Sequence, residues 1–141
     1  MDNLHERGGS TKVLHLHGEL TLVRSTGDES LIYDVGEKEV NLGDKCEKGH
    51  QLRPHIVWFG EAVPLIPEAA RIAAQADFFA VVGTSLNVYP AAGLLSAAPY
   101  NTPVFLIDPN PVSVASRSDV TFIQEPASKG VDRMLEMIRG K

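Results

Sequence analysis

The sequence has one cysteine, no long apolar run and no basic block, and each shortage excludes a class of protein. A single cysteine, Cys46, cannot form an internal disulfide or the paired-cysteine knuckles of a structural zinc site. The formal net charge of −5, with no cluster of Lys and Arg, argues against a nucleic-acid partner. The apolar runs are too short to span a bilayer, and the opening residues, MDNLHERGG, do not form a signal peptide. We therefore expect a cytoplasmic protein without a membrane, nucleic-acid or metal partner.

What the sequence does contain is enough apolar material for one globular domain. The chain has 141 residues, of which 43% are hydrophobic and 22% are charged. From residue 67 onward, predicted helices at 67–76, 90–98 and 127–139 alternate with apolar strands at 78–82, 104–107 and 120–123. This alternation is typical of an α/β fold with a parallel sheet and crossover helices. The run at 78–82 is predicted to be buried on both faces.

The first part of the chain is less regular. Its sequence predicts a short helix at 2–7, a strand at 12–16 that ends at His17-Gly18, and extended segments at 20–23 and 31–33. Residues 34–50 are polar and rich in loop-forming residues, and 56–59 is extended and apolar. We expect a small loop-rich insertion rather than core in this region.

Three features fall where strands are expected to end: His17-Gly18, Gly83-Thr84-Ser85 and Asp108-Pro109-Asn110. In open α/β sheets, ligands bind at the carboxyl ends of strands, where glycine lets the backbone approach a ligand closely. A carboxylate there can bind ribose hydroxyls, and a histidine can act as a general base near neutral pH. Each feature also has a simpler interpretation, as a structural imidazole, an ordinary loop or a turn. No Gly-x-Ser-x-Gly elbow supports a hydrolase.

Several motifs occur in a fixed order along the chain: DNLH at 2–5, LHG at 16–18, RP at 53–54, VWFGE at 57–61 and GTSLNVYPA at 83–91. In this order and spacing they resemble the sirtuins (the Sir2 family), which are NAD-dependent protein-lysine deacylases. The resemblance covers nearly the whole chain outside residues 21–50. It implies a Rossmann-like domain, NAD as the cofactor and an acyl-lysine protein or peptide as the substrate.

The resemblance also implies roles for individual residues. It makes His17 the catalytic base on a ribose hydroxyl after nicotinamide leaves, and it places Asp2 near the nicotinamide pocket. The implied contacts to NAD ribose, phosphate and adenosine are Gly83, Thr84, Ser85, Asp108, Pro109, Asn110 and Ala127. The acyl-lysine peptide would lie as an added strand between two segments, Val57, Trp58, Phe59, Gly60 and Glu61 on one side and Asn87 and Val88 on the other.

Two departures from the family pattern carry further expectations. Only Cys46 lies where the family usually has four zinc cysteines, so we expect no zinc. The module should instead be packed by Leu22, Val23, Leu31, Ile32 and Tyr33. The family's Gly-Ala-Gly-x-Ser loop, whose amides would cradle the NAD pyrophosphate, is absent before Asp2. We therefore expect the C-terminal portion of a deacylase: residues 1–20 and 51–141 form part of the Rossmann-like sheet, and 21–50 forms the inserted module.

Two functions from different classes follow. The first is an NAD-dependent deacylase that transfers the acyl group of lysine to ADP-ribose and releases nicotinamide. This chain alone would then be a poor catalyst, because an incomplete ribose site cannot hold NAD in a reactive pose. The alternative is a non-catalytic module that binds NAD or ADP-ribose, or that assembles as a homo-oligomer or by complementation through an exposed sheet edge.

Overall fold

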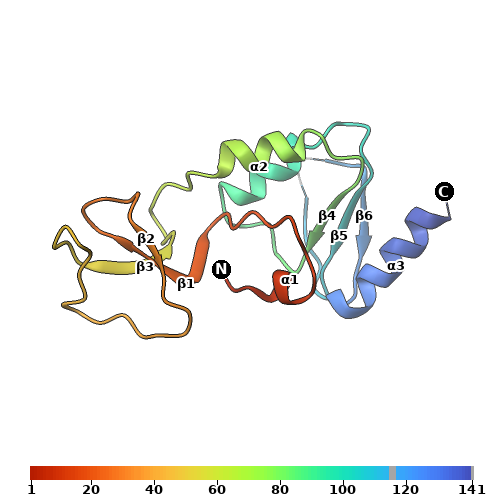
Figure 1. Cartoon of the computed structure of the whole chain (residues 1–141). Coiled ribbons are helices and arrows are strands. Elements are labelled where there is room, and N and C mark those ends of the chain that lie inside the picture. The colour runs from red at the N-terminus through yellow and green to blue at the C-terminus, as the bar shows by residue number, and fades with distance from the viewer. Residues whose placement is uncertain (115–116, 141) are drawn as a thin grey trace. The chain divides into compact units, whose positions relative to one another are not determined.

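The computed structural model describes residues 1–114 and 117–140 and contains two compact units, Met1–Pro64 and Leu65–Lys141. Each unit is built on its own three-stranded sheet (Figure 1). The two sheets differ in kind, because the first is antiparallel and the second is parallel.

The second unit alternates helices and strands, as the sequence predicts. Its sheet has the order β4-β5-β6, and each neighbouring pair is parallel. In Figure 1, α3 lies on one side of these strands, and α2 and η1 lie on the other. The elements are α2 (Ile66–Ala73), β4 (Phe79–Val82), the 3-10 helix η1 (Ala91–Ala97), β5 (Val104–Ile107), β6 (Val120–Ile123) and α3 (Ala127–Arg139).

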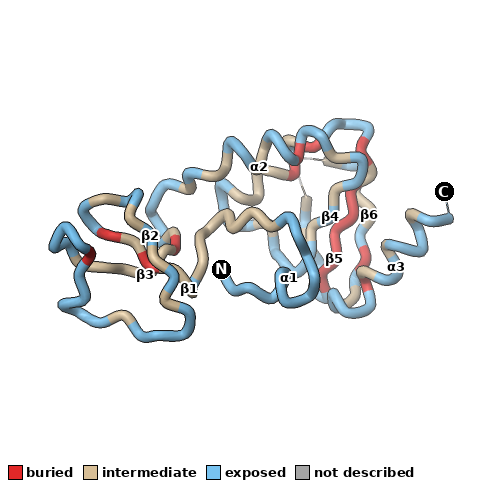
Figure 2. The backbone as a smooth tube through the Cα atoms, viewed as in Figure 1, coloured by how far each residue is buried: buried red, intermediate tan, exposed pale blue. Residues whose placement is uncertain are grey.

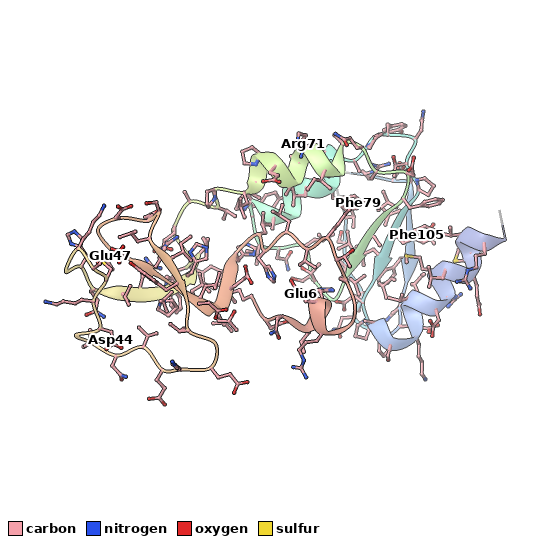
Figure 3. All side chains as sticks on the ribbon, viewed as in Figure 1. Glu6, Asp44, Glu47, Arg71, Phe79 and Phe105 are labelled. Carbon is pink, nitrogen blue, oxygen red and sulfur yellow. The ribbon has the colours of Figure 1, made fainter. Side chains whose placement is uncertain are left out.

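The core of this unit is centred on β5, all four residues of which are buried (Figure 2). Phe105, Ile107 and Ile123 form a buried cluster against which residues of α3 pack. Phe105 is labelled on β5 in Figure 3. The residues of α3 that pack against the cluster are Val131, Met134 and Ile138, which share one face of the helix. The predicted amphipathic helix at 127–139 is therefore confirmed, together with the face that it buries.

The prediction that the strand at 78–82 is buried on both faces is wrong, and β5 alone fits that description. In β4, Ala80 and Val82 are exposed, because β5 is the only neighbour of β4 among the described strands. The Phe79 N–H donates to the carbonyl of Pro103, just before β5, and the Gly83 N–H donates to the carbonyl of Ile107, the last residue of β5. By alternation, the N–H groups of Ala80 and Val82 point toward the open edge.

The first unit contains the short helix α1 (Leu4–Arg7) and an antiparallel sheet in the order β2-β1-β3. Its strands are β1 (Gly18–Ser25), β2 (Ile32–Asp34) and β3 (Leu52–Ile56). The predicted strand at 12–16 is wrong, since the chain turns there and the Gly18 N–H donates to the His15 carbonyl at 3.0 Å. The ladder begins only at Gly18, where φ is +79° and a Cβ would lie 2.0 Å from the His55 carbonyl oxygen.

The loop-rich part of this unit has little apolar core. Val23 is buried as expected, but Ile32 is 43% exposed, because β2 is a three-residue edge strand that turns this side chain outward. The other buried groups are Ser25 and Cys46, with 3.3 Å between the thiol and the hydroxyl oxygen. The same part of the chain contains two polar pairs: Lys48 with Asp28 at 2.7 Å, and Tyr33 with Glu47. Apolar packing is therefore only part of what holds the module.

Across residues 1–114 and 117–140, every helix is too short or too polar to cross a membrane.

Gly130 marks the closest approach of α3 to β5. A Cβ at this position would lie 2.3 Å from the Cγ2 methyl of Ile107, which is fully buried. We expect Gly130→Ala to destabilise the chain by about 1–3 kcal/mol through overpacking, despite the better helix propensity of alanine. Urea unfolding measures this change.

Gly93→Ala is the matched control, since the nearest atom to its Cβ would be 3.9 Å away. Equal stability of the two variants would contradict the packing account.

Candidate functional site

The turns after β4 and β5 lie at the same edge of the parallel sheet. The Gly83 N–H donates to the carbonyl of Ile107 at 2.9 Å, and Ile107 directly precedes Asp108. The Asp108 N–H in turn donates to the carbonyl of Ile123, the last residue of β6, at 3.3 Å. The two predicted turns, 83–85 and 108–110, are thus adjacent because the parallel register places the ends of their strands together.

The third turn joins this edge through Gln124. Its side-chain amide donates to the Pro109 carbonyl at 3.4 Å. Three residues later, Ala127 begins α3. The structure therefore brings the predicted contacts Gly83, Asp108 and Ala127 to one end of one sheet, on three consecutive turns.

The Gly83–Ser85 turn exposes its polar groups. Gly83 has φ +67°, a conformation that favours glycine, and a Cβ there would meet no atom within 4 Å. The Thr84 Oγ1 accepts the Leu86 N–H at 3.2 Å, and its hydroxyl can in addition donate its proton to a ligand. Leu86 has a positive φ of 56°. Such a conformation stores strain of the kind found at ligand-binding turns.

Asp108 is the buried acceptor of this edge. The residue is 8% exposed, and its Oδ1 accepts the Asn110 N–H at 2.8 Å in an Asx turn. This bond fixes the orientation of the carboxylate, and the second oxygen can accept a hydrogen bond from a hydroxyl of a bound ligand. Pro109 and Asn110 are exposed beside it.

Asn87 and Val88 follow the same turn and lie on the surface. Val88 is 51% exposed, and its carbonyl accepts the Ala92 N–H at 2.9 Å where η1 begins. The start of η1 thus holds this part of the predicted substrate-binding segment in place.

In the first unit, His17 lies beside the start of the segment 57–61. The Val57 N–H donates to the His17 carbonyl at 3.0 Å, and Gly18 pairs with Ile56 across β1 and β3. The imidazole of His17 belongs to a half-buried residue that immediately precedes β1. The structure therefore places the predicted catalytic base next to one of the two predicted substrate segments.

Asp2 is held at the surface by the start of α1. Its Oδ1 accepts the Leu4 N–H at 3.0 Å, and this bond is the main cause that lowers the pKa of Asp2. The preceding residue is tied to β1, because the Leu20 N–H donates to the Met1 carbonyl at 2.9 Å.

The extended run predicted at 56–59 ends at its first residue, and the chain turns over 58–61 instead. β3 ends at Ile56, and the Glu61 N–H donates to the Trp58 carbonyl at 3.0 Å. Gly60, with φ +88°, allows this tight turn. The turn presents Phe59, 95% exposed, and Trp58, 54% exposed, to solvent.

The carboxylate of Glu61 is bound by several donors. It accepts two hydrogen bonds from the Arg53 guanidinium, at 2.7 and 3.1 Å, and one from the Trp58 N–H at 3.0 Å. The Arg53 hydrogen bonds are the largest cause that lowers the pKa of Glu61 to about 2. Glu61 therefore stays ionised across the physiological range.

The remaining predictions concern metals and the joining of the two sets of residues. Within the described residues, no three His, Cys, Asp or Glu side chains lie close enough to hold a metal ion. The absence of zinc from the protein stays a prediction. His17, Asp2 and 57–61 belong to the first unit, and the other predicted contacts belong to the second. That the two sets of residues form one site for NAD and the peptide, as the resemblance implies, also stays a prediction.

Sequence reasoning missed the contacts that Gln124 and Arg53 make. Gln124 directly follows the β6 strand, so the rule on carboxyl ends could have found it. Arg53 and Glu61 are eight residues apart with a turn between them, and neither helical nor strand periodicity connects such a pair.

The parallel sheet and its three adjoining turns define a Rossmann-like α/β protein. Residues 1–90 match the sequence model of the Sir2 family. The chain therefore belongs to the Sir2 family, as the motifs predict.

Curated relatives agree with this assignment. An NAD-dependent protein deacylase of Bacteroides thetaiotaomicron is 48% identical over 143 residues, which cover 98% of this chain and 61% of the relative. One of Helicobacter pylori is 49% identical over 127 residues, which cover 90% of this chain and 55% of the relative. The chain thus spans little more than half the length of these relatives.

Solved structures match the fold. A complex of a Sir2 homolog with NAD has a TM-score of 0.82 and 33% identity, and the match covers 99% of this chain and 56% of that one. A Sir2 protein bound to a propionylated peptide has a TM-score of 0.73 and 27% identity, covering 97% of this chain and 60% of that one. The predicted partial Rossmann-like fold is confirmed.

His55 gives the first unit a pH dependence. It pairs with Glu19 across β1 and β3, and among the described residues its buried Nδ1 has no hydrogen-bond partner. Burial first, and then the charge of Arg24, lowers the pKa of His55 below its ordinary value of 6.5. The unfolded chain therefore binds the proton more readily, and stability should fall as the pH drops below about 6.5. Urea unfolding at pH 7.5 and 5.5, followed by the fluorescence of Trp58, measures this loss.

The variant His55→Gln should lose most of the difference between the two pH values. His5→Gln, which changes an exposed histidine of α1, is the control and should keep it. An unchanged pH dependence in His55→Gln would contradict the assignment.

Proposed function

We propose that this chain is the C-terminal part of an NAD-dependent protein-lysine deacylase, which transfers the acyl group of lysine to ADP-ribose and releases nicotinamide. The observation that carries the proposal is the meeting of the turns at Gly83 and Asp108 at one sheet edge, in a chain of the Sir2 family. Its curated relatives are named NAD-dependent protein deacylases, and a solved homolog holds NAD.

In this proposal the second unit binds the nucleotide. Gly83 offers an open backbone, Thr84 and Ser85 offer hydroxyl donors to ribose and phosphate, and the buried Asp108 carboxylate accepts a ribose hydroxyl. Pro109, Asn110 and Ala127 complete the adenosine side of the site. When bound, NAD would supply the ADP-ribosyl group, whose ribose hydroxyl receives the acyl group once nicotinamide has left.

The first unit supplies the base and one side of the peptide site. His17 removes the proton of a ribose hydroxyl, and Asp2 lies toward the nicotinamide end. The acyl-lysine peptide adds as a strand between 57–61 and 87–88, held by main-chain hydrogen bonds. A Sir2 structure with a propionylated peptide supports this class of substrate. The same proposal includes three further expectations. Residues 21–50 are inserted into a domain formed by 1–20 and 51–141, the protein binds no zinc, and it is located in the cytoplasm.

The test is nicotinamide release from NAD with an acetyl-lysine peptide. We expect slow release by the chain alone, and faster release when the part of the Bacteroides relative that the chain does not match is added as a separate polypeptide. His17→Ala should lower the stimulated rate by about 10²–10⁴-fold, the usual contribution of a general base. His5→Ala should leave it unchanged. A stimulated rate that survives His17→Ala would contradict the assigned base.

The exposed edge of β4 favours a second function, assembly through strand pairing. The amides of Ala80 and Val82 face this edge, and an unpaired strand is a template for another chain. We propose that the chain self-associates there.

Light scattering over a range of concentrations measures this association. Val82→Lys should shift the chain toward monomer, since lysine on an edge strand opposes pairing. The matched control is Ile72→Lys on the exposed part of α2, which should not change the mass. A wild-type chain that is monomeric at every concentration would exclude this second function.

A further inference from the structure

The turn at 58–61 is closed twice, once by the main chain and once by a side chain. The Glu61 N–H donates to the Trp58 carbonyl, and the Trp58 N–H donates to the Glu61 Oε2, both at 3.0 Å. The backbone hydrogen bond is common in β-turns. The carboxylate hydrogen bond is additional, and it gives the Trp58 N–H at the start of the turn an acceptor. Residue 61 therefore determines the shape of the turn through both its backbone and its side chain.

Arg53 anchors that carboxylate to the sheet. Its guanidinium binds both oxygens of Glu61 in a fork, at 2.7 and 3.1 Å, which is the strongest geometry for such a pair. Arg53 also lies directly opposite Arg24 in the β1–β3 ladder, where two like charges repel. The Arg24 guanidinium is 3.7 Å from the Glu61 Oε2, so one carboxylate compensates both cations.

These contacts leave the Glu61 carboxylate little capacity for a ligand. A carboxylate has about four acceptor positions. Three are occupied by the two Arg53 bonds and the Trp58 N–H, and Arg24 lies against the same oxygen as that N–H. The exposed groups of the turn are instead Trp58 and Phe59. At its other end the segment is fixed by the bond between the Val57 N–H and the His17 carbonyl.

We propose that Glu61 is a positioning residue for peptide recognition: its carboxylate shapes the turn 58–61 through Arg53 and the Trp58 N–H and does not itself bind the peptide. This inference rests on the proposed function, and it assigns a distinct role to one residue of the segment 57–61. A peptide that adds as a strand is held by main-chain groups, so its affinity depends on a segment that is already in the bound shape. The Arg53–Glu61 fork supplies that preorganisation.

The chain contains a single tryptophan, and it lies in this turn, so its fluorescence reports directly on the segment. In Glu61→Ala we expect the emission of Trp58 to shift to longer wavelength and its acrylamide quenching to increase, because the turn loses its closure. Glu61→Gln keeps an acceptor for the Trp58 N–H but loses the charged fork, and should give a smaller change. Circular dichroism and the thermal midpoint establish that each variant is folded.

Binding measurements separate positioning from general damage. With the 141-residue chain, we expect the Kd for an acetyl-lysine peptide to rise about tenfold or more in Glu61→Ala, as for loss of a charge-assisted hydrogen bond. The Kd for ADP-ribose should stay within about twofold. The matched control is Glu125→Gln, which breaks the 3.0 Å Arg133–Glu125 pair of the other unit and should change neither fluorescence nor peptide affinity.

The outcomes decide the inference and the proposed function separately. Unchanged Trp58 fluorescence and unchanged peptide affinity in both Glu61 variants would overturn the inference. An equal loss of peptide and ADP-ribose affinity would also overturn it, since it would indicate a general structural role. If the wild-type chain binds no acyl-lysine peptide, the proposed function fails, while the fluorescence still shows whether Glu61 holds the turn.

Discussion

The parallel ladder of β4, β5 and β6 is the constraint on which the nucleotide side of the candidate site depends. β5 is buried along its whole length, so its register against both neighbours is fixed by packing as well as by hydrogen bonds. In that register the Gly83 N–H donates a hydrogen bond to the Ile107 carbonyl, and the Asp108 N–H donates one to the Ile123 carbonyl. The turns meet because the strands that precede them end at the same level.

The sequence predicts the parallel sheet well, for a physical reason. Short apolar runs such as 104–107, bounded by turn residues, have the length and composition of buried strands, and the helix at 127–139 shows its buried face by its spacing. The turns 83–85 and 108–110 are predictable as neighbours, because carboxyl ends of parallel strands share an edge. The burial of β4 is not predictable, because it depends on which strands lie beside it.

The first unit is harder to predict because polar contacts determine much of its structure. The run at 12–16 looks like a strand, yet it has no pairing partner, and the ladder begins where Gly18 permits close approach to His55. Lys48 and Ser30 lower the pKa of Asp28 to about 2, and Glu47 raises the pKa of Tyr33 to about 12. The Lys48–Asp28 and Tyr33–Glu47 pairs join residues 20 and 14 positions apart in the sequence, and local patterns of hydrophobicity do not reveal them.

The contact of Gly130 with Ile107 has a consequence for the surface of the molecule. It lies three residues beyond Ala127, so it acts as a pivot close to the end of α3 that adjoins Asp108 and Gln124. The first turn of the helix can move only as far as the fully buried Ile107 allows. The interior thereby sets how closely the start of α3 can approach the turns at Asp108 and Gln124, and a methyl group added at Gly130 would displace that end of the helix.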